Sequence, residues 1–134
     1  MKFLFDANLP PHLARAISAL AVSVDPRVAE VVHLRDKFAP STSDSVWLAE
    51  LVGEGDWAVI SQDGFAKSDI EKTLISRAGV TVFVLEPAWA KQRYWDKCVQ
   101  AIRWWPKIVA QTELSTSSVR VPWNTTSKFR DLRH

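Results

Sequence analysis

Two aspartates of the sequence stand just behind apolar runs, where the chain leaves a predicted buried strand. Asp6 follows KFLF at residues 2–5, and Asp63 comes three residues after Ile60. A third acid, Asp44, opens a predicted helix behind a polar loop. Carboxylates that meet at one point repel one another unless a cation lies between them, and oxygen-only ligands suit Mg²⁺ or Mn²⁺ rather than zinc. Such an ion polarises a phosphodiester and activates water for in-line attack.

Each of these acids also has a purely structural explanation. Asp44 or Ser43 can cap the helix that follows, and Asp63 before Gly64 is an ordinary turn pair. Asp6 is harder to explain in this way, because an acid that abuts a buried strand needs a partner. The sequence alone leaves both explanations open for Asp44 and Asp63.

Nearby polar residues carry weaker signals. Asn8 either caps the first helix or assists the acidic site, and we expect the cap. His12 and His33 lie far apart without the spacing of metal ligands, so we expect ordinary surface or partly buried side chains.

Strand and helix patterns alternate along the chain and must position these acids. Strand-type runs occupy residues 2–5, 31–34, 57–60 and 80–85; helical spacing appears over 13–21, 46–52, 70–75 and 94–105, where Pro106 bends or ends the last helix. Each link is long enough for a right-handed crossover, which indicates an α/β fold with a parallel sheet and helices on both faces. Ligands of such sheets bind beyond the carboxyl ends of the strands, where Asp6 stands.

The composition is that of a globular protein, with 134 residues of which 47% are hydrophobic and 24% charged. The single cysteine, Cys98, excludes an internal disulfide and a cysteine zinc site. No signal-peptide pattern opens the chain, and no apolar stretch reaches the length of a membrane span. We therefore expect a cytoplasmic protein that does not bind membranes.

Charge and aromatic residues are unevenly distributed. Residues 1–87 carry 8 basic and 12 acidic side chains, whereas residues 88–134 carry 9 and 3. The asymmetry indicates a nucleic-acid or acidic partner, or simply two differently solvated faces. Trp104 and Trp105 are adjacent, so a helix cannot bury both in the same direction. Either one of them is exposed for docking, or both pack against different parts of the domain.

The motifs taken together resemble the PIN-like domains. FLFDANLPPHLARAI is similar to the first strand and helix of that family, STSDSVWLAEL to its second acidic position, and WAVISQDGFAKSD to its third. GVTVFVLEPAW and the helix ending RWWPKIV resemble the small VapC-like branch. The resemblance covers about residues 1–110 and implies a three-layer α/β/α domain with a central, mainly parallel sheet. Residues 111–134 then form a connector, a small edge strand at 119–121 and a C-terminal tail.

The resemblance implies a Mg²⁺- or Mn²⁺-dependent ribonuclease, typically the toxin of a type II toxin–antitoxin pair. RNA is then the substrate, a cognate antitoxin the partner, and a homodimer a further expectation. Asp6, Asp44 and Asp63 take the catalytic and metal-binding positions. Asp69 is a loosely matched fourth metal ligand that equally suits a helix start beside Ser68. Aspartate at the second position, where PIN nucleases often carry glutamate, leaves the metal geometry open.

Three further residues are candidates for contact with the substrate. Arg35 and Lys67 lie in predicted loops near the site, where they neutralise phosphate or are merely solvated; Asn8 is the third. Two rival interpretations remain. One is an inactive PIN-like module whose Trp-rich second half binds a protein. The other is a flavodoxin-like phosphoacceptor, which is weakened because no well-placed lysine follows VTVFVL and no aspartate stands within a regular five-fold βα repeat.

Overall fold

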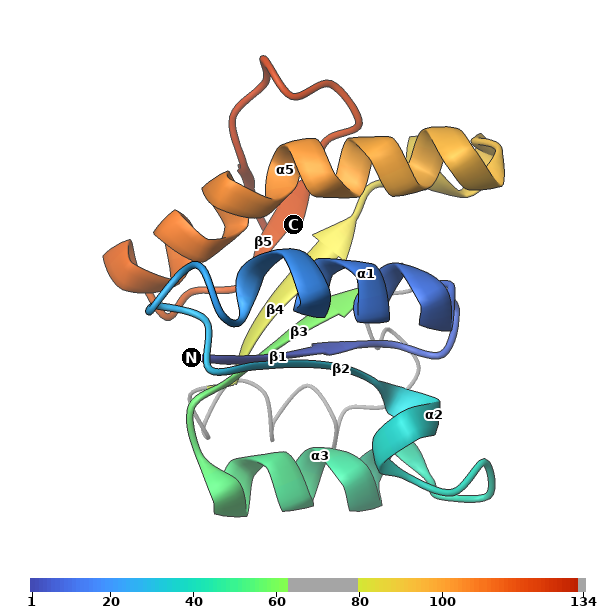
Figure 1. Ribbon diagram of the computed structural model, residues 1–134, viewed down its shortest axis with the longest axis vertical. Helices are drawn as coiled ribbons and strands as arrows, with labels where there is room; N and C mark the ends of the chain where they lie inside the picture. The colour runs from blue at the N-terminus through green and yellow to red at the C-terminus, as the bar shows by residue number, and fades with distance from the viewer. Residues whose placement is uncertain (63–79, 133–134) are drawn as a thin grey trace.

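A central sheet organises the protein, and the computed structural model describes residues 1–62 and 80–132 of the chain. Within these residues six strands pair in the order β2-β1-β3-β4-β5-β6 (Figure 1). Their bounds are β1 Lys2–Phe5, β2 Glu30–His33, β3 Trp57–Ser61, β4 Thr81–Leu85, β5 Val119–Val121 and β6 Arg130–Asp131. The strands β1 to β5 are mutually parallel, and β6 alone is antiparallel to its neighbour β5.

Helices cover both faces of the sheet. They are α1 (Pro11–Ala21), α2 (Leu34–Lys37), α3 (Asp44–Glu54), the 3-10 helix η1 (Pro87–Lys91) and α5 (Tyr94–Leu114). Figure 1 shows α1 and α5 on one face and α2 and α3 on the other. The expected three-layer α/β/α architecture with a mainly parallel sheet is therefore confirmed. The helix expected over 70–75 lies outside the described residues.

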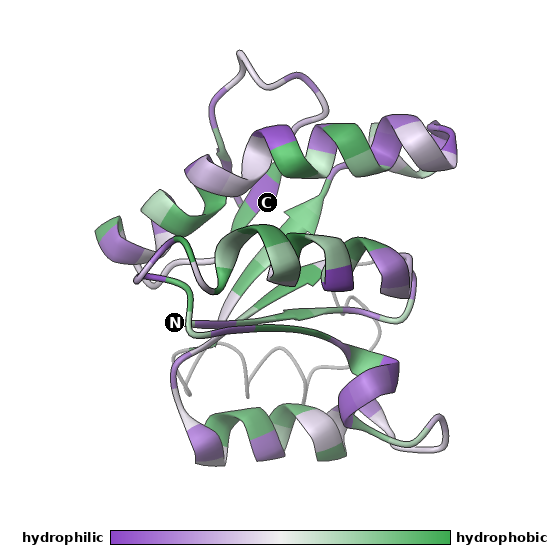
Figure 2. Cartoon of the chain, in the orientation of Figure 1, coloured by the Kyte–Doolittle hydropathy of each residue, from purple (hydrophilic) through white to green (hydrophobic). Residues whose placement is uncertain are grey.

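The core consists of two apolar layers, one on each side of the sheet. Side chains alternate along β1, so Phe3 and Phe5 face the layer under α1 and α5, whereas Leu4 faces the layer over α3. Trp105 packs edge-on against Phe3 with a centroid distance of 4.7 Å. Figure 2 shows the central strands β3 and β4 mostly in the green of hydrophobic residues, as expected when helices cover both faces.

The direction in which the chain crosses the sheet reverses at β1. The first crossover, through α1, places β2 on one side of β1, and the next places β3 on the other side. The carboxyl ends of β1 and β3 therefore border a crevice between oppositely directed connections. In open α/β sheets this switch point is the preferred site for ligands.

Of the two effects expected of Pro106, bending or ending the last helix, the ending does not occur. The helix continues through Pro106 to Leu114, although an interior proline removes a hydrogen bond and costs about 3 kcal/mol. Buried side chains on both sides of the proline, including Trp105 and Val109, offset this cost, since each contributes about 1.5–3 kcal/mol by burial.

Both adjacent tryptophans of α5 are buried, so the idea that one of them is exposed for docking is wrong. Trp105 lies against β1, while Trp104 packs on Phe129 and donates its indole N–H to the Trp123 carbonyl at 3.2 Å. The exposed tryptophan of this helix is Trp95. The two rings thus fill different parts of one core, the second of the expected alternatives.

The C-terminal segment extends the sheet rather than trailing from it. The strand expected at 119–121 is present as β5, but it is not at the edge, because β6 pairs with it on the outer side. The division expected between residues 110 and 111 falls inside α5. None of the helices in the described part of the chain is long and apolar enough to cross a membrane.

Candidate active site

Asp6 lies at the switch point, where backbone contacts join it to both neighbouring segments. Its N–H donates to the Ile60 carbonyl at 3.0 Å, and its own carbonyl accepts from the Leu9 N–H at 3.0 Å. One carboxylate oxygen accepts from the Ala7 N–H at 2.7 Å, and the other accepts from the Ser61 hydroxyl at 3.0 Å. The residue is only 5% exposed. The end of β1 is thereby fastened to the end of β3 through the acid itself.

Ser61 is a site residue that the sequence did not single out. It is the last residue of β3 and is fully buried. Its hydroxyl donates a hydrogen bond to Asp6, which lies 55 positions earlier in the sequence. Strand register explains the contact: Phe5 pairs with Ile60, so the residues that follow them are neighbours at the carboxyl end of the sheet. A small hydroxyl residue at the end of the third predicted strand is the signal that points to it.

His33 is buried, which corrects the expectation of a surface or partly buried side chain. It is 1% exposed, its Nε2 lies 2.7 Å from the Leu9 carbonyl, and its Nδ1 accepts from the Arg35 N–H at 3.1 Å. These partners assign the neutral tautomer with the proton on Nε2. The ring therefore ties the turn after Asp6 to the end of β2 and the start of α2.

Asn8 does not cap the first helix. It is exposed in the turn between β1 and α1, and the N-cap position of α1 belongs to Pro10, which offers no side-chain cap. Pro11 occupies the first helical position, where a missing N–H costs nothing, so the helix starts without a capping side chain. A role of Asn8 in substrate contact stays a prediction.

Asp44 is exposed at the first residue of α3. Ser43 holds the N-cap position, but neither side chain supplies a cap hydrogen bond; Asp44 Oδ1 instead accepts the indole N–H of buried Trp47 at 3.0 Å. The capping explanation therefore fails, and the acid is anchored to the core by Trp47. Its negative charge at a helix N-terminus is favourable in any case.

Of the remaining predicted site residues, one lies within the described part of the chain and three lie outside it. Arg35 is exposed on α2 and donates to the Pro40 carbonyl at 3.0 Å, which holds it beside the loop that leads to α3. Asp63, Lys67 and Asp69 lie outside the described residues. Within residues 1–62 and 80–132, no three acid, histidine or cysteine side chains come together as metal ligands. The convergence of Asp6, Asp44 and Asp63 thus stays a prediction.

An ion pair links the two helices that leave this end of the sheet. Arg15 of α1 contacts Asp36 of α2 in a bidentate arrangement, with distances of 3.0 and 2.8 Å. The hydrogen bonds from Arg15 hold the pKa of the Asp36 carboxyl below its usual value. Because both side chains are exposed, the pair contributes little stability.

The donor chemistry of the site fits a hard divalent cation. The described residues at the switch point offer the Asp6 carboxylate and the Ser61 hydroxyl, both oxygen ligands of the kind that Mg²⁺ and Mn²⁺ prefer. The sequence places Asp63 two residues beyond Ser61. The fold is that of a doubly wound α/β protein with a buried acid at the carboxyl end of its sheet.

The comparison with protein families names the class more closely. The model of the PIN-like domain matches residues 1–87, which is well over half of the chain, and the protein belongs to this family. No match was found among curated proteins or solved structures. PIN domains are in general metal-dependent nucleases. The match also separates this protein from flavodoxin-like proteins, which share the strand order 2-1-3-4-5.

Proposed function

We propose that this protein is a divalent-metal-dependent endoribonuclease, the VapC-like toxin of a type II toxin–antitoxin pair. The observation that carries the proposal is the buried Asp6 carboxylate, fixed by Ala7 and Ser61 at the switch point of a PIN-like fold. A buried acid costs free energy unless it is well partnered, and such residues cluster at functional sites.

The proposed roles follow from position and chemistry. Asp6, Asp44 and Asp63 would hold one or two Mg²⁺ or Mn²⁺ ions, with Asp69 as a further ligand. When bound, the metal supplies Lewis-acid polarisation of the phosphodiester. The Ser61 hydroxyl and the Ala7 N–H fix the direction of the Asp6 carboxylate. Asn8, Arg35 and Lys67 are proposed contacts to the RNA.

The test compares two aspartate variants on a labelled single-stranded RNA with Mg²⁺ or Mn²⁺. Asp6→Asn keeps the shape, and its amide can still accept from Ala7 and donate to Ser61, so the fold should survive. We expect cleavage to fall by about 100-fold or more and to stop with chelator. The matched control is Asp131→Asn in β6, whose partner in the sheet is the first residue of β5, at the end opposite Asp6. Cleavage that persists in chelator or in Asp6→Asn contradicts the proposal.

A cognate antitoxin is the proposed partner, and the outer side of α5 offers a surface for it. Trp95, Val99 and Ile102 follow the i, i+4, i+7 spacing of one helix stripe and are 76%, 48% and 39% exposed. The exposed basic residue Arg93 precedes this α5 stripe. An acidic amphipathic helix of the antitoxin has the complementary charge and apolar face.

A protein-interaction module without catalysis is the second candidate function, and the same α5 stripe favours it. Co-purification with the product of the neighbouring reading frame tests the partner in both cases. Trp95→Ser should abolish the complex, and Leu20→Ser, a matched exposed apolar position on α1, should leave it intact. A concentration-dependent dimer in the absence of that product would instead assign the stripe to a second copy. Complex formation without any RNA cleavage would favour the module.

A further inference from the structure

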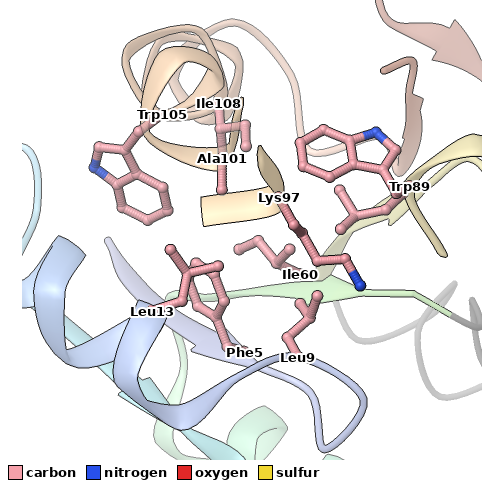
Figure 3. Close-up of a pocket in the computed structure, with 10 residues that line it drawn as sticks. Phe5, Leu9, Leu13, Ile60, Trp89, Lys97, Ala101, Trp105 and Ile108 are labelled. Carbon is pink, nitrogen blue, oxygen red and sulfur yellow. The ribbon is translucent and has the colours of Figure 1, made fainter. Parts of the chain in front are cut away.

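One lysine of α5 reaches the carboxyl end of the sheet through an apolar pocket. The pocket lies between the sheet and α5, and it is lined by Phe5, Leu9, Ile60, Trp89 and Trp105 among others, together with Lys97 (Figure 3). The cavity measures about 10 Å³, room for one water molecule at most. The cavity is therefore too small for a ligand. Its apolar walls pack around the methylene chain of Lys97.

The Lys97 side chain lies beside residues that hold the backbone of Asp6. Figure 3 shows it running from α5 toward Leu9, with the amino group as its free end. Three wall residues of this pocket surround Asp6 in the chain or contact it: Phe5 precedes it, Leu9 donates to its carbonyl, and Ile60 accepts from its N–H. The lysine thus lies next to the switch point, on the α5 side of the sheet.

The amine of Lys97 forms no ion pair with any residue in the described part of the chain. Lys37, Arg15 and Arg27 are each paired with an acid, whereas no hydrogen bond or ion pair of the Lys97 amine occurs among residues 1–62 and 80–132. Lys91 and Arg93 stand nearby, at the end of η1 and directly before α5, and they likewise form no ion pair with a described residue. Three cations therefore lie where the chain passes from η1 into α5.

We infer that Lys97 binds a phosphate of the RNA backbone next to the one that is cleaved, an inference that rests on the proposed function. An acidic site repels a polyanion, so a strand that enters it needs cations on the approach. A lysine whose stem is packed loses little side-chain entropy on binding, because the pocket has already ordered it. Lys91 and Arg93 extend the same approach. The competing explanation is a lysine that merely covers apolar surface with its stem and keeps its amine in water.

The experiment measures RNA binding in the Asp6→Asn background, so that cleavage does not interfere. The probe is a short fluorescein-labelled single-stranded RNA, and anisotropy is recorded over a series of salt concentrations. Lys97→Met keeps an apolar stem in the pocket and removes only the charge. Lys97→Arg retains the charge, and Arg103→Met removes an equal charge from an exposed position on the same helix. Thermal unfolding of each variant verifies the fold.

We expect Lys97→Met to weaken binding about three- to tenfold and to reduce the slope of log K against log salt by about 0.7, the value for one phosphate contact to a single strand. Lys97→Arg should restore most of the affinity, and Arg103→Met should change it less than about twofold. Equal losses for Lys97→Met and Arg103→Met would overturn the inference while leaving the nuclease proposal intact. Normal RNA cleavage by the Lys97→Met variant of the otherwise unchanged protein would overturn the inference as well. If the unchanged protein cleaves no RNA and the Asp6→Asn variant binds none, both the inference and the nuclease proposal are removed.

Discussion

Replacing Ser61 by alanine tests whether the carboxylate of Asp6 is held as an anion at the switch point. The hydroxyl lies 3.0 Å from Oδ2, Ser61 is fully buried and Asp6 is 5% exposed, so water cannot replace the lost donor freely. Hydrogen bonds to charged groups contribute about 1.5–3 kcal/mol, against about 0.5–1.5 kcal/mol for neutral pairs. Ser61→Ala should therefore lower the free energy of unfolding by about 1.5–3 kcal/mol.

The same substitution in the Asp6→Asn background separates charge from packing. There the pair is neutral, so Ser61→Ala should cost only about 0.5–1.5 kcal/mol. Urea unfolding monitored by tryptophan fluorescence resolves the difference, because an m-value of about 1–3 kcal/mol/M turns 2 kcal/mol into a midpoint shift of about 1 M. Ser45→Ala, at an exposed serine pair of α3, should stay within about 0.5 kcal/mol of the parent. Equal losses in the two backgrounds would refute a charged, site-forming Asp6.

Three further predictions concern the core around the site. His33→Phe leaves the Leu9 carbonyl and a backbone N–H without their buried partner and should cost about 2–4 kcal/mol in urea unfolding; a loss below about 0.5 kcal/mol would contradict the assigned network. Burial raises the pKa of the Cys98 thiol, so less of the reactive thiolate exists at a given pH, and alkylation at about pH 8 should be slow until urea unfolds the chain; equal rates would be inconsistent with burial. Trp105→Ala should cost about 3–5 kcal/mol, while Trp95→Ala on the exposed stripe should stay within about 0.5 kcal/mol, and similar losses would disprove the assigned packing.

The nuclease proposal and the Lys97 inference together describe a site with two walls. On one side Asp6 and Ser61 supply oxygen ligands, and on the other α5 supplies cations. An anionic substrate and a cationic metal are then bound by different elements of one fold.

Local pattern in the sequence was sufficient for β1 to β5, for α1, α3 and α5, and for the position of Asp6, whereas α2, η1 and β6 were not predicted. Apolar runs such as KFLF and VTVFVL predict strands, their alternation with helical spacing predicts a parallel sheet, and the carboxyl ends of such strands predict the place of the site. The predictions of strands and of a parallel sheet succeed because periodicity depends on residues close in sequence, whereas the place of the site stays a prediction. The match to the PIN-like family has the same origin.

Tertiary structure decided the contacts that local pattern does not contain. The register of the strands places Ser61 beside Asp6, although the two residues are 55 positions apart in sequence. The buried His33 ring contacts the Leu9 carbonyl in the turn after β1. Helix α5 continues through Pro106, a residue that local propensity disfavours in a helix, because side chains on both sides of it are buried. The neighbouring residues Trp104 and Trp105 are both buried, in different parts of one core. In each case many long-range contacts contribute more free energy than the few kcal/mol of a local preference, so the folded chain and not the segment determines the outcome.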